Sequence, residues 1–159
     1  MMKTGLFVGS FDPYTIGHHS VVRRALPLFD KIVIGVGVNP EKKYAFTSEQ
    51  RVQAIKEIYA DEPRIEVVAY ADLAIDLAQR VGAGFLIKGV RNVRDFEYER
   101  DQADFNRTMG GVETLLLFTE PALQGISSTL VREMKHFGKD TSAFVPKKND
   151  ETTANSEAE

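Results

Sequence analysis

Short apolar stretches rich in β-branched residues alternate along the chain with segments in which apolar residues recur every three or four positions. Such alternation predicts strands separated by helices. The apolar stretches predict strands at residues 4–8, 32–38, 65–70, 85–87 and 115–119. The intervening segments predict helices through residues 21–29, after a Thr47–Gln50 capping box, and over residues 73–81, 96–107 and 128–137, with Gly82 and Gly138 as end signals.

The order of these segments predicts an α/β fold. Each strand is apolar on both faces, as a strand must be in a parallel sheet that helices cover on both sides. We therefore expect a doubly wound, Rossmann-like, five-stranded parallel sheet with helices on both faces. This domain is expected over residues 1–146. Residues 147–159 have no large apolar side chain and are predicted to form a disordered polar tail.

Composition narrows the classes of function. A length of 159 residues fits one ordinary domain. The absence of Cys excludes disulfides, thiolate metal sites and a Cys nucleophile. A formal net charge of -3 argues against a broad surface for nucleic acid or anionic membranes. No apolar run approaches the ~18 residues of a membrane span. We expect a cytoplasmic protein that has neither nucleic acid nor a membrane as partner.

The loop after the first strand, residues 9–18, carries the first candidate chemistry. Ligands of such sheets bind at the carboxyl ends of the strands. A helix begins within this loop, and its free N–H groups suit a phosphate. Gly9 and Gly17 let the backbone approach a ligand closely, and His18 can donate a hydrogen bond to a phosphate oxygen. The same residues also fit an ordinary strand–helix connection in which His18 caps the helix or packs.

Two later segments could likewise either bind an anion or have an ordinary structural role. The hydroxyl residues Ser127, Ser128 and Thr129 open the last helix, where they can cap it or hold phosphate oxygens. Lys88 and Arg91 follow the fourth strand, where a polyanion could dock, although a solvated, charge-balanced loop fits as well. Among the other polar residues, Asp12 is a lone carboxylate beside the first loop, and His19 and His136 are expected to be surface or packing residues.

Taken together, these segments resemble a known family. Residues 9–18 are similar to the (T/S)-F-D-P-x-x-x-G-H signature of the nucleotidyltransferase superfamily, and residues 126–132 resemble its I-S-S-T-x-V-R element. Residues 88–99 resemble the (R/K)-G-x-R-x-x-x-D-F-E-Y-E segment of bacterial phosphopantetheine adenylyltransferases, and residues 39–47 also match that family. The resemblance spans residues 4–146. It departs at Lys88, where the family often has Arg, and after Pro146, where relatives often have a final helix.

The resemblance implies a reaction and a set of partners. Enzymes of this family transfer AMP from ATP to 4′-phosphopantetheine, which gives dephospho-CoA and pyrophosphate. They use Mg²⁺, which we expect to be carried with ATP rather than in a dedicated protein metal site. They commonly assemble as hexamers, so the resemblance implies a homohexamer. A phosphate of the substrate is the nucleophile, and catalysis therefore rests on alignment and on stabilisation of charge.

The resemblance also implies roles for individual residues. Catalytic roles fall to Ser10, His18, Lys42 and Arg91, with His18 acting as a hydrogen-bond donor. Contacts to 4′-phosphopantetheine fall to Ser10, Lys42, Ala74 and Lys88. Contacts to ATP fall to Ser10, Phe11, His18, Gly89, Val90, Arg91, Glu99, Leu123, Gln124, Gly125, Ile126, Ser127, Ser128 and Thr129.

Other functions stay open at this level. The first loop alone also fits a glycerol-3-phosphate cytidylyltransferase or a nicotinamide mononucleotide adenylyltransferase. Lys42 and residues 88–99 favour phosphopantetheine as the acceptor. A non-catalytic nucleotide-binding module that kept the fold is a third hypothesis, against which the intact Ser10, His18 and Arg91 argue.

Overall fold

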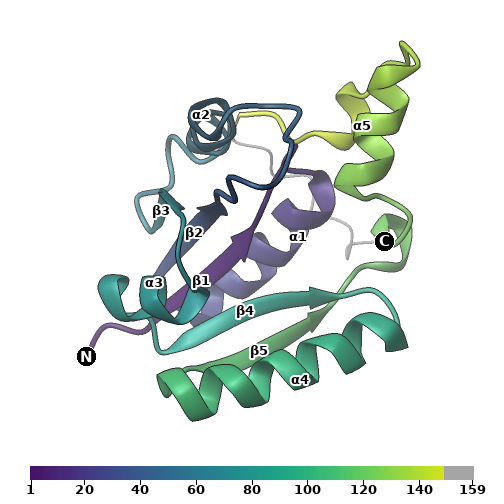
Figure 1. Cartoon of the computed structure of the whole chain (residues 1–159). Helices are drawn as coiled ribbons and strands as arrows, with labels where there is room; N and C mark the ends of the chain where they lie inside the picture. The colour runs from purple at the N-terminus through teal and green to yellow at the C-terminus, as the bar shows by residue number, and fades with distance from the viewer. Residues whose placement is uncertain (149–159) are drawn as a thin grey trace, which may run out of the picture.

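Parallel strands form a five-stranded sheet in the computed structural model, which describes residues 1–148 (Figure 1). The strands are β1 (Thr4–Gly9), β2 (Lys31–Gly37), β3 (Ile65–Tyr70), β4 (Phe85–Val90) and β5 (Glu113–Phe118). The helices are α1 (Ile16–Ala25), α2 (Ser48–Ile58), α3 (Ala74–Val81), α4 (Val93–Gly110) and α5 (Ser128–His136), with short 3₁₀ turns η1 (Leu26–Leu28), η2 (Pro121–Leu123) and η3 (Ser142–Phe144).

The sheet has the order β3-β2-β1-β4-β5. The chain builds outward from β1 to β3, then crosses back and pairs β4 with the free side of β1. The order of the strands therefore reverses between β1 and β4. At such a reversal the loops diverge and leave a crevice at the carboxyl ends of the strands. The predicted doubly wound, Rossmann-like fold is confirmed, and this crevice is expected beyond the ends of β1 and β4.

Alternate residues of the strands build a separate core on each face of the sheet. Phe7 of β1 packs with α1 and α2, whereas its neighbour Leu6 packs with α3. Because successive side chains of a strand point to opposite faces, a strand that is buried on both sides must be apolar throughout. This is why the five strands were recognisable as continuous apolar runs. Gly35 of β2 supports close packing, since a Cβ there would lie 2.7 Å from Leu77 Cδ2.

The ends of the helices agree with the local signals in the sequence. Thr15 and Thr47 cap α1 and α2, and each forms a capping box with the residue three positions later. The predicted Gly82 ends α3 with a φ of 67°, a left-handed conformation that favours glycine. Gly138 has a φ of 73° two residues after α5. Such end signals depend only on neighbouring residues, so they can be read from the sequence alone.

Several boundaries predicted from the sequence were wrong, and two of them lie beside the candidate site. The fourth strand continues to Val90, since Lys88, Gly89 and Val90 pair with β5. The polar Lys88 hid this continuation, and this residue belongs to the strand rather than to the loop after it. Helix α4 begins at Val93, because Asn92 caps it by accepting a hydrogen bond from Asp95 N–H.

Two further predictions concern the ends of the chain and membranes. Most of the predicted disordered tail, residues 149–159, lies outside the described residues, and the remaining Lys147 and Lys148 are exposed. Within residues 1–148, no helix has the length and apolar character needed to cross a membrane.

Candidate functional site

Two clefts open side by side at the carboxyl ends of the strands. The α1 cleft, of about 330 Å³, lies between β1, the start of α1, β4 and residues 119–128. The β2 cleft, of about 440 Å³, lies between the ends of β1, β2 and β3 and the loop of residues 38–44. Both clefts are lined by Val8, Gly9 and Lys88. The two clefts therefore meet at the end of β1, the place where the strand order reverses.

His18 lies in the first turn of α1 and lines the α1 cleft. Its ring stacks on Tyr14 with centroids 5.3 Å apart, and the Phe11 ring lies nearly perpendicular to it with centroids 5.0 Å apart. Its Nδ1 accepts a hydrogen bond of 3.0 Å from Thr15 N–H. Because Nδ1 is an acceptor, the neutral ring carries its proton on Nε2. The capping box thus leaves Nε2–H as the donor of this side chain.

The charge state of His18 follows from its surroundings. Burial among the aromatic rings, and then the positive charge of Arg91, lower the pKa of His18 from its ordinary value to about 4. Both effects disfavour the charged imidazolium. At neutral pH His18 is therefore an uncharged hydrogen-bond donor at the N-terminus of α1.

Charged side chains of β4 and α4 line the opposite wall of the α1 cleft. Arg91 Nε donates to Asp95 Oδ2 at 3.1 Å, and Asp95 Oδ2 also accepts from Arg91 N–H. Lys88 Nζ lies 3.6 Å from Glu99 Oε2, an oxygen that is buried without a hydrogen-bond partner. The Lys88 and Glu99 side chains are 23% and 15% exposed. At 3.6 Å the ammonium group of Lys88 forms an ion pair with Glu99 but no hydrogen bond to Oε2. Lys88 can therefore still donate hydrogen bonds to an anion in the cleft.

The predicted hydroxyl residues at the start of α5 have separate contacts. Ser127 caps the helix by accepting from Leu130 N–H. Ser128 Oγ donates to the carbonyl of Pro13 at 2.8 Å, which ties α5 to the first loop. Ser127 and Ser128 both line the α1 cleft, whereas Thr129 does not. Ser127 therefore caps the helix and also lines the cleft, so its capping role does not exclude the contact with phosphate oxygens that the sequence left open.

Two arginines that the sequence did not single out as site residues, the buried Arg51 and the half-buried Arg132, hold the first loop in place. The Arg51 side chain is buried, and its NH1 donates to the carbonyls of Ser10 at 2.6 Å and Gly37 at 2.9 Å. Arg132 NH1 donates to the carbonyl of Asp12 at 2.8 Å. Phe11 has a φ of 50°, the left-handed region that non-glycine residues rarely adopt. These hydrogen bonds stabilise a loop conformation that is unfavourable by itself.

Asp12 has a structural contact rather than the isolated position that its sequence context indicated. Its carboxylate is buried and accepts hydrogen bonds from Ala45 N–H at 2.8 Å and Phe46 N–H at 3.0 Å. Asp12 therefore joins the first loop to the end of the loop that carries Lys42. The walls of the two clefts are thus held together by one carboxylate.

A buried chain of hydrogen bonds lies behind His18. Tyr14 Oη lies 2.7 Å from Tyr59 Oη, which lies 2.9 Å from His19 Nδ1. Burial, followed by the neighbouring Tyr59, raises the pKa of Tyr14, so this phenol stays protonated. His19 is buried, so of the two expected roles, surface or packing, it has the packing one, and it is linked through Tyr59 to Tyr14, on which His18 stacks. In the sequence, these hydrogen bonds were indicated only by polar aromatic residues at positions where the pattern calls for apolar ones.

The structure brings most of the predicted site residues to the two clefts. The residues that line neither cleft are Ala74, Val90, Gln124, Gly125 and Thr129. Those in the β2 cleft are Ser10, Lys42 and Lys88. Those in the α1 cleft are Phe11, His18, Lys88, Gly89, Arg91, Glu99, Leu123, Ile126, Ser127 and Ser128.

Acidic side chains near the clefts have polar partners within the protein. Asp12 is committed to two backbone N–H groups, Asp95 to Arg91, and Glu99 to Lys88. Among residues 1–148, His, Asp and Glu side chains form no group of three or more that could hold a metal ion.

Comparison with known proteins identifies the relatives of this chain. Residues 6–134 match the family model described as Cytidylyltransferase-like. A Phocaeicola vulgatus protein named phosphopantetheine adenylyltransferase is 53% identical over 91% of this chain and 96% of its own length. Proteins of the same name from Bacteroides fragilis and Leuconostoc citreum are 52% and 46% identical, each over 92% of this chain and over 97% and 93% of their own lengths.

Solved structures agree on the fold. A bifunctional NMN adenylyltransferase/ADP ribose pyrophosphatase from Francisella tularensis superposes with a TM-score of 0.69 and 18% identity, over 91% of this chain and 45% of its own. A lipopolysaccharide core biosynthesis protein from Thermoplasma volcanium gives a TM-score of 0.55 at 18% identity, over 76% of this chain and 98% of its own. At these identities the likeness extends to the fold alone.

Proposed function

The chain belongs to the phosphopantetheine adenylyltransferase family, and from this premise we propose that its two clefts hold the two substrates of one transfer reaction. The protein is a nucleotidyltransferase that moves AMP from ATP to 4′-phosphopantetheine. A phosphate oxygen of 4′-phosphopantetheine attacks the α-phosphorus of ATP, and the bond to the bridging oxygen of the β-phosphate breaks. The products are dephospho-CoA and pyrophosphate.

One observation carries the assignment of the substrates to the clefts. Lys88 lines both clefts at the point where they meet, so the attacking and the attacked phosphates can converge on its ammonium group. ATP suits the α1 cleft, where the N-terminus of α1, His18 and Arg91 are suited to a triphosphate. 4′-Phosphopantetheine suits the β2 cleft, where Lys42 and Lys88 are the lining cations and Ser10 offers a hydroxyl.

Catalysis in this arrangement rests on placement and on fixed donors. Negative charge moves onto the α-phosphate oxygens and the leaving pyrophosphate as the reaction proceeds. The Nε2–H of His18 and the cation of Lys88 stabilise that charge without having to reorganise. The phosphate nucleophile is ionised at neutral pH, so a general base is not required. His18, with its lowered pKa, is suited to hydrogen bonding and not to proton transfer.

We propose that Mg²⁺ enters as part of the MgATP substrate. The acidic side chains beside the clefts are already paired with cations or with backbone N–H groups. Oxygens of the triphosphate and water are therefore the ligands left for Mg²⁺, which prefers oxygen and retains water readily. This ion supplies positive charge next to the phosphates. The need for cellular ATP also supports a cytoplasmic location.

Release of pyrophosphate tests the proposed function. The purified protein is incubated with ATP or CTP and with 4′-phosphopantetheine, glycerol 3-phosphate or nicotinamide mononucleotide. We expect release with ATP and 4′-phosphopantetheine alone. Release with CTP and glycerol 3-phosphate, or with ATP and nicotinamide mononucleotide, would assign the enzyme to another nucleotidyltransferase reaction. Failure of every pair would support a non-catalytic nucleotide-binding module.

Lys42→Ala tests the assignment of the β2 cleft. Loss of one charged contact to the acceptor phosphate should raise the KM for 4′-phosphopantetheine about 10- to 100-fold. The KM for ATP should stay within about twofold, because Lys42 does not line the α1 cleft. Lys43→Ala is the matched control, since Lys43 is exposed and lines neither cleft. An equal rise of both KM values would contradict this division of the substrates.

We also infer that the chain assembles as a homohexamer through α4, the helix along the lower edge of Figure 1. This helix exposes Tyr98, Phe105 and Met109 at 64%, 46% and 63%, and their spacing of seven and four residues places them on one face. Exposed apolar side chains gathered on one face are typical of an interface. Phe105→Glu should therefore lower the sedimentation coefficient, whereas Lys56→Glu on α2 should leave it unchanged. A Phe105 variant that sediments like the wild type would exclude this face.

A further inference from the structure

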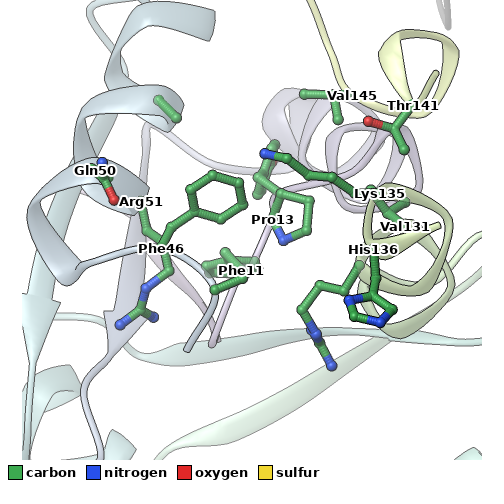
Figure 2. A pocket seen from close by; sticks show the side chains of 14 residues that line it. Phe11, Pro13, Phe46, Gln50, Arg51, Val131, Lys135, His136, Thr141 and Val145 are labelled. Atoms are coloured by element: carbon green, nitrogen blue, oxygen red, sulfur yellow. The ribbon is translucent and has the colours of Figure 1, made fainter. Parts of the chain in front are cut away.

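A third cavity borders the first loop (Figure 2). It has a volume of about 460 Å³ and is bounded by the first loop, the start of α2, α5 and residues 141–145. We call it the α2–α5 cavity. It shares Phe11 with the α1 cleft and no residue with the β2 cleft. A molecule in it would therefore occupy neither of the two substrate positions.

The wall of this cavity is mainly apolar. Apolar side chains from four parts of the chain form it, namely Phe11, Pro13, Phe46, Ala54, Val131 and Val145. Figure 2 shows Phe46 on the α2 side and Val131 on the α5 side, with Pro13 between them. Pockets for small organic molecules typically have volumes of about 300–1,000 Å³, apolar walls and a few polar groups. The α2–α5 cavity has the size and lining of such a pocket.

The charged side chains that line the cavity within residues 1–148 are positive. Its charged and titratable lining residues, apart from the buried Tyr14, are Arg51, Arg132, Lys135 and His136, and none of the Asp and Glu residues within 1–148 lines it. Arg51 and Arg132 are engaged with backbone carbonyls of the first loop. Lys135 is exposed and extends from α5 toward Phe46, with Nζ 4.4 Å from the ring centroid. Its ammonium group therefore stands over the apolar wall.

We propose that the α2–α5 cavity is a second binding site, for a small amphipathic organic anion. An aromatic ring or short acyl chain would contact Phe46, Pro13 and Val131, and a single carboxylate, sulfonate or phosphate would lie beside Lys135 and His136. The apolar wall would bury the apolar part of the ligand, and the positive charge of Lys135 sets the sign of the ligand's charged group. The acidic residues 149–159 contain no large apolar side chain that could fill this wall.

Such an occupant would rest against the back of the loop that lines the substrate clefts. Phe11 has one side in the cavity and another in the α1 cleft. Arg51 and Arg132, which hold the carbonyls of Ser10 and Asp12, also line the cavity. The site is thus separate from the substrates in space and continuous with the residues that hold the first loop.

Fluorescence titration with 8-anilinonaphthalene-1-sulfonate, an aromatic anion, tests the proposal. We expect the full-length protein to bind one molecule per chain in this cavity and to keep it at saturating ATP. Ala54→Trp should remove that one equivalent, because the indole would fill the cavity from an exposed position on α2. Gln53→Trp is the matched control, since Gln53 is exposed and does not line the cavity. Full displacement by ATP, or unchanged binding to the Ala54 variant, would overturn the proposal.

A second pair of variants tests the predicted charge of the ligand. Lys135→Gln should weaken binding of the sulfonate about threefold to tenfold, the effect of one exposed charge pair. It should change binding of the uncharged N-phenyl-1-naphthylamine less. Lys139→Gln is the control, because Lys139 is exposed and lies outside the cavity. If Lys135→Gln weakens both probes equally, or neither, the cavity has no preference for anions and this part of the proposal is wrong.

Discussion

Replacing His18 with Ala should lower kcat about 10²- to 10³-fold, the typical effect of losing one donor to a charge that develops in the transition state. The KM values for ATP and 4′-phosphopantetheine should change little, because the lost hydrogen bond strengthens mainly as the reaction proceeds. The structure supplies the reason, since Thr15 N–H occupies Nδ1 and leaves Nε2–H as the donor. Steady-state kinetics of the wild type and the variant, with either substrate varied, measure both quantities.

Two further measurements separate hydrogen bonding from other roles of His18. His18→Gln can place an amide N–H near the position of Nε2, so it should retain more of the rate than His18→Ala. The pH profile of kcat should show no loss of rate from His18 titration near pH 6.5, because its pKa is lowered to about 4. An Ala variant with nearly normal kcat, or a rate that falls as a group with pKa near 6.5 protonates and that loses this dependence in the variant, would exclude the proposed role.

The lowered pKa of His18 also makes the stability of the folded chain depend on pH. Above about pH 6.5 His18 is neutral in both the folded and the unfolded chain. As the pH falls from there toward about 4, the unfolded chain binds a proton at this residue and the folded chain does not. The free energy of unfolding should therefore decrease over this range, and His18→Gln should decrease less. Urea unfolding at pH 7.5 and pH 5 compares the two proteins.

Lys88→Met should produce the other large effect, a fall in kcat/KM of about 10²-fold or more for each substrate. Lys88 lines both clefts, so its removal takes a positive charge away from the attacking and the attacked phosphate together. Lys88→Arg should keep activity within about tenfold of the wild type, since the charge is retained while the geometry of the contact changes. A loss confined to one substrate would contradict the position of Lys88 between them.

The partner of Lys88 requires a second variant. Removing this lysine leaves the Glu99 carboxylate, 15% exposed, without its cation, and an unpaired sheltered charge is destabilising. Lys88→Met with Glu99→Gln removes both charges and should recover most of the stability that the single variant loses. The rate should stay low in the double variant if Lys88 acts on the phosphates. Recovery of the rate together with stability would mean that the single variant failed through misfolding.

Local sequence patterns were enough to predict the fold class, the order of the elements and the family resemblance of this protein. The strand order along the chain, the capping residues Thr47 and Gly82, and the first loop were all recognisable, because apolar periodicity and turn residues act over a few neighbours. The α/β class followed from strands that are apolar on both faces. The family resemblance rested on residues 9–18, 88–99 and 126–132, each a continuous segment. Where a polar residue interrupted an apolar run, as Lys88 does in β4, the same reasoning ended the strand too early.

The tertiary structure alone decided how these segments act together. Arg132 reaches the carbonyl of a residue 120 positions earlier, and Arg51 reaches one 41 positions earlier, so no local pattern could reveal that they hold the first loop. The sheltered pairing of Lys88 with Glu99 depends on how α4 packs on β4, and the lowered pKa of His18 depends on the rings and the cation that surround it. Residue type and order determine which groups are available; burial and long-range packing decide which of them are already committed and which face a ligand.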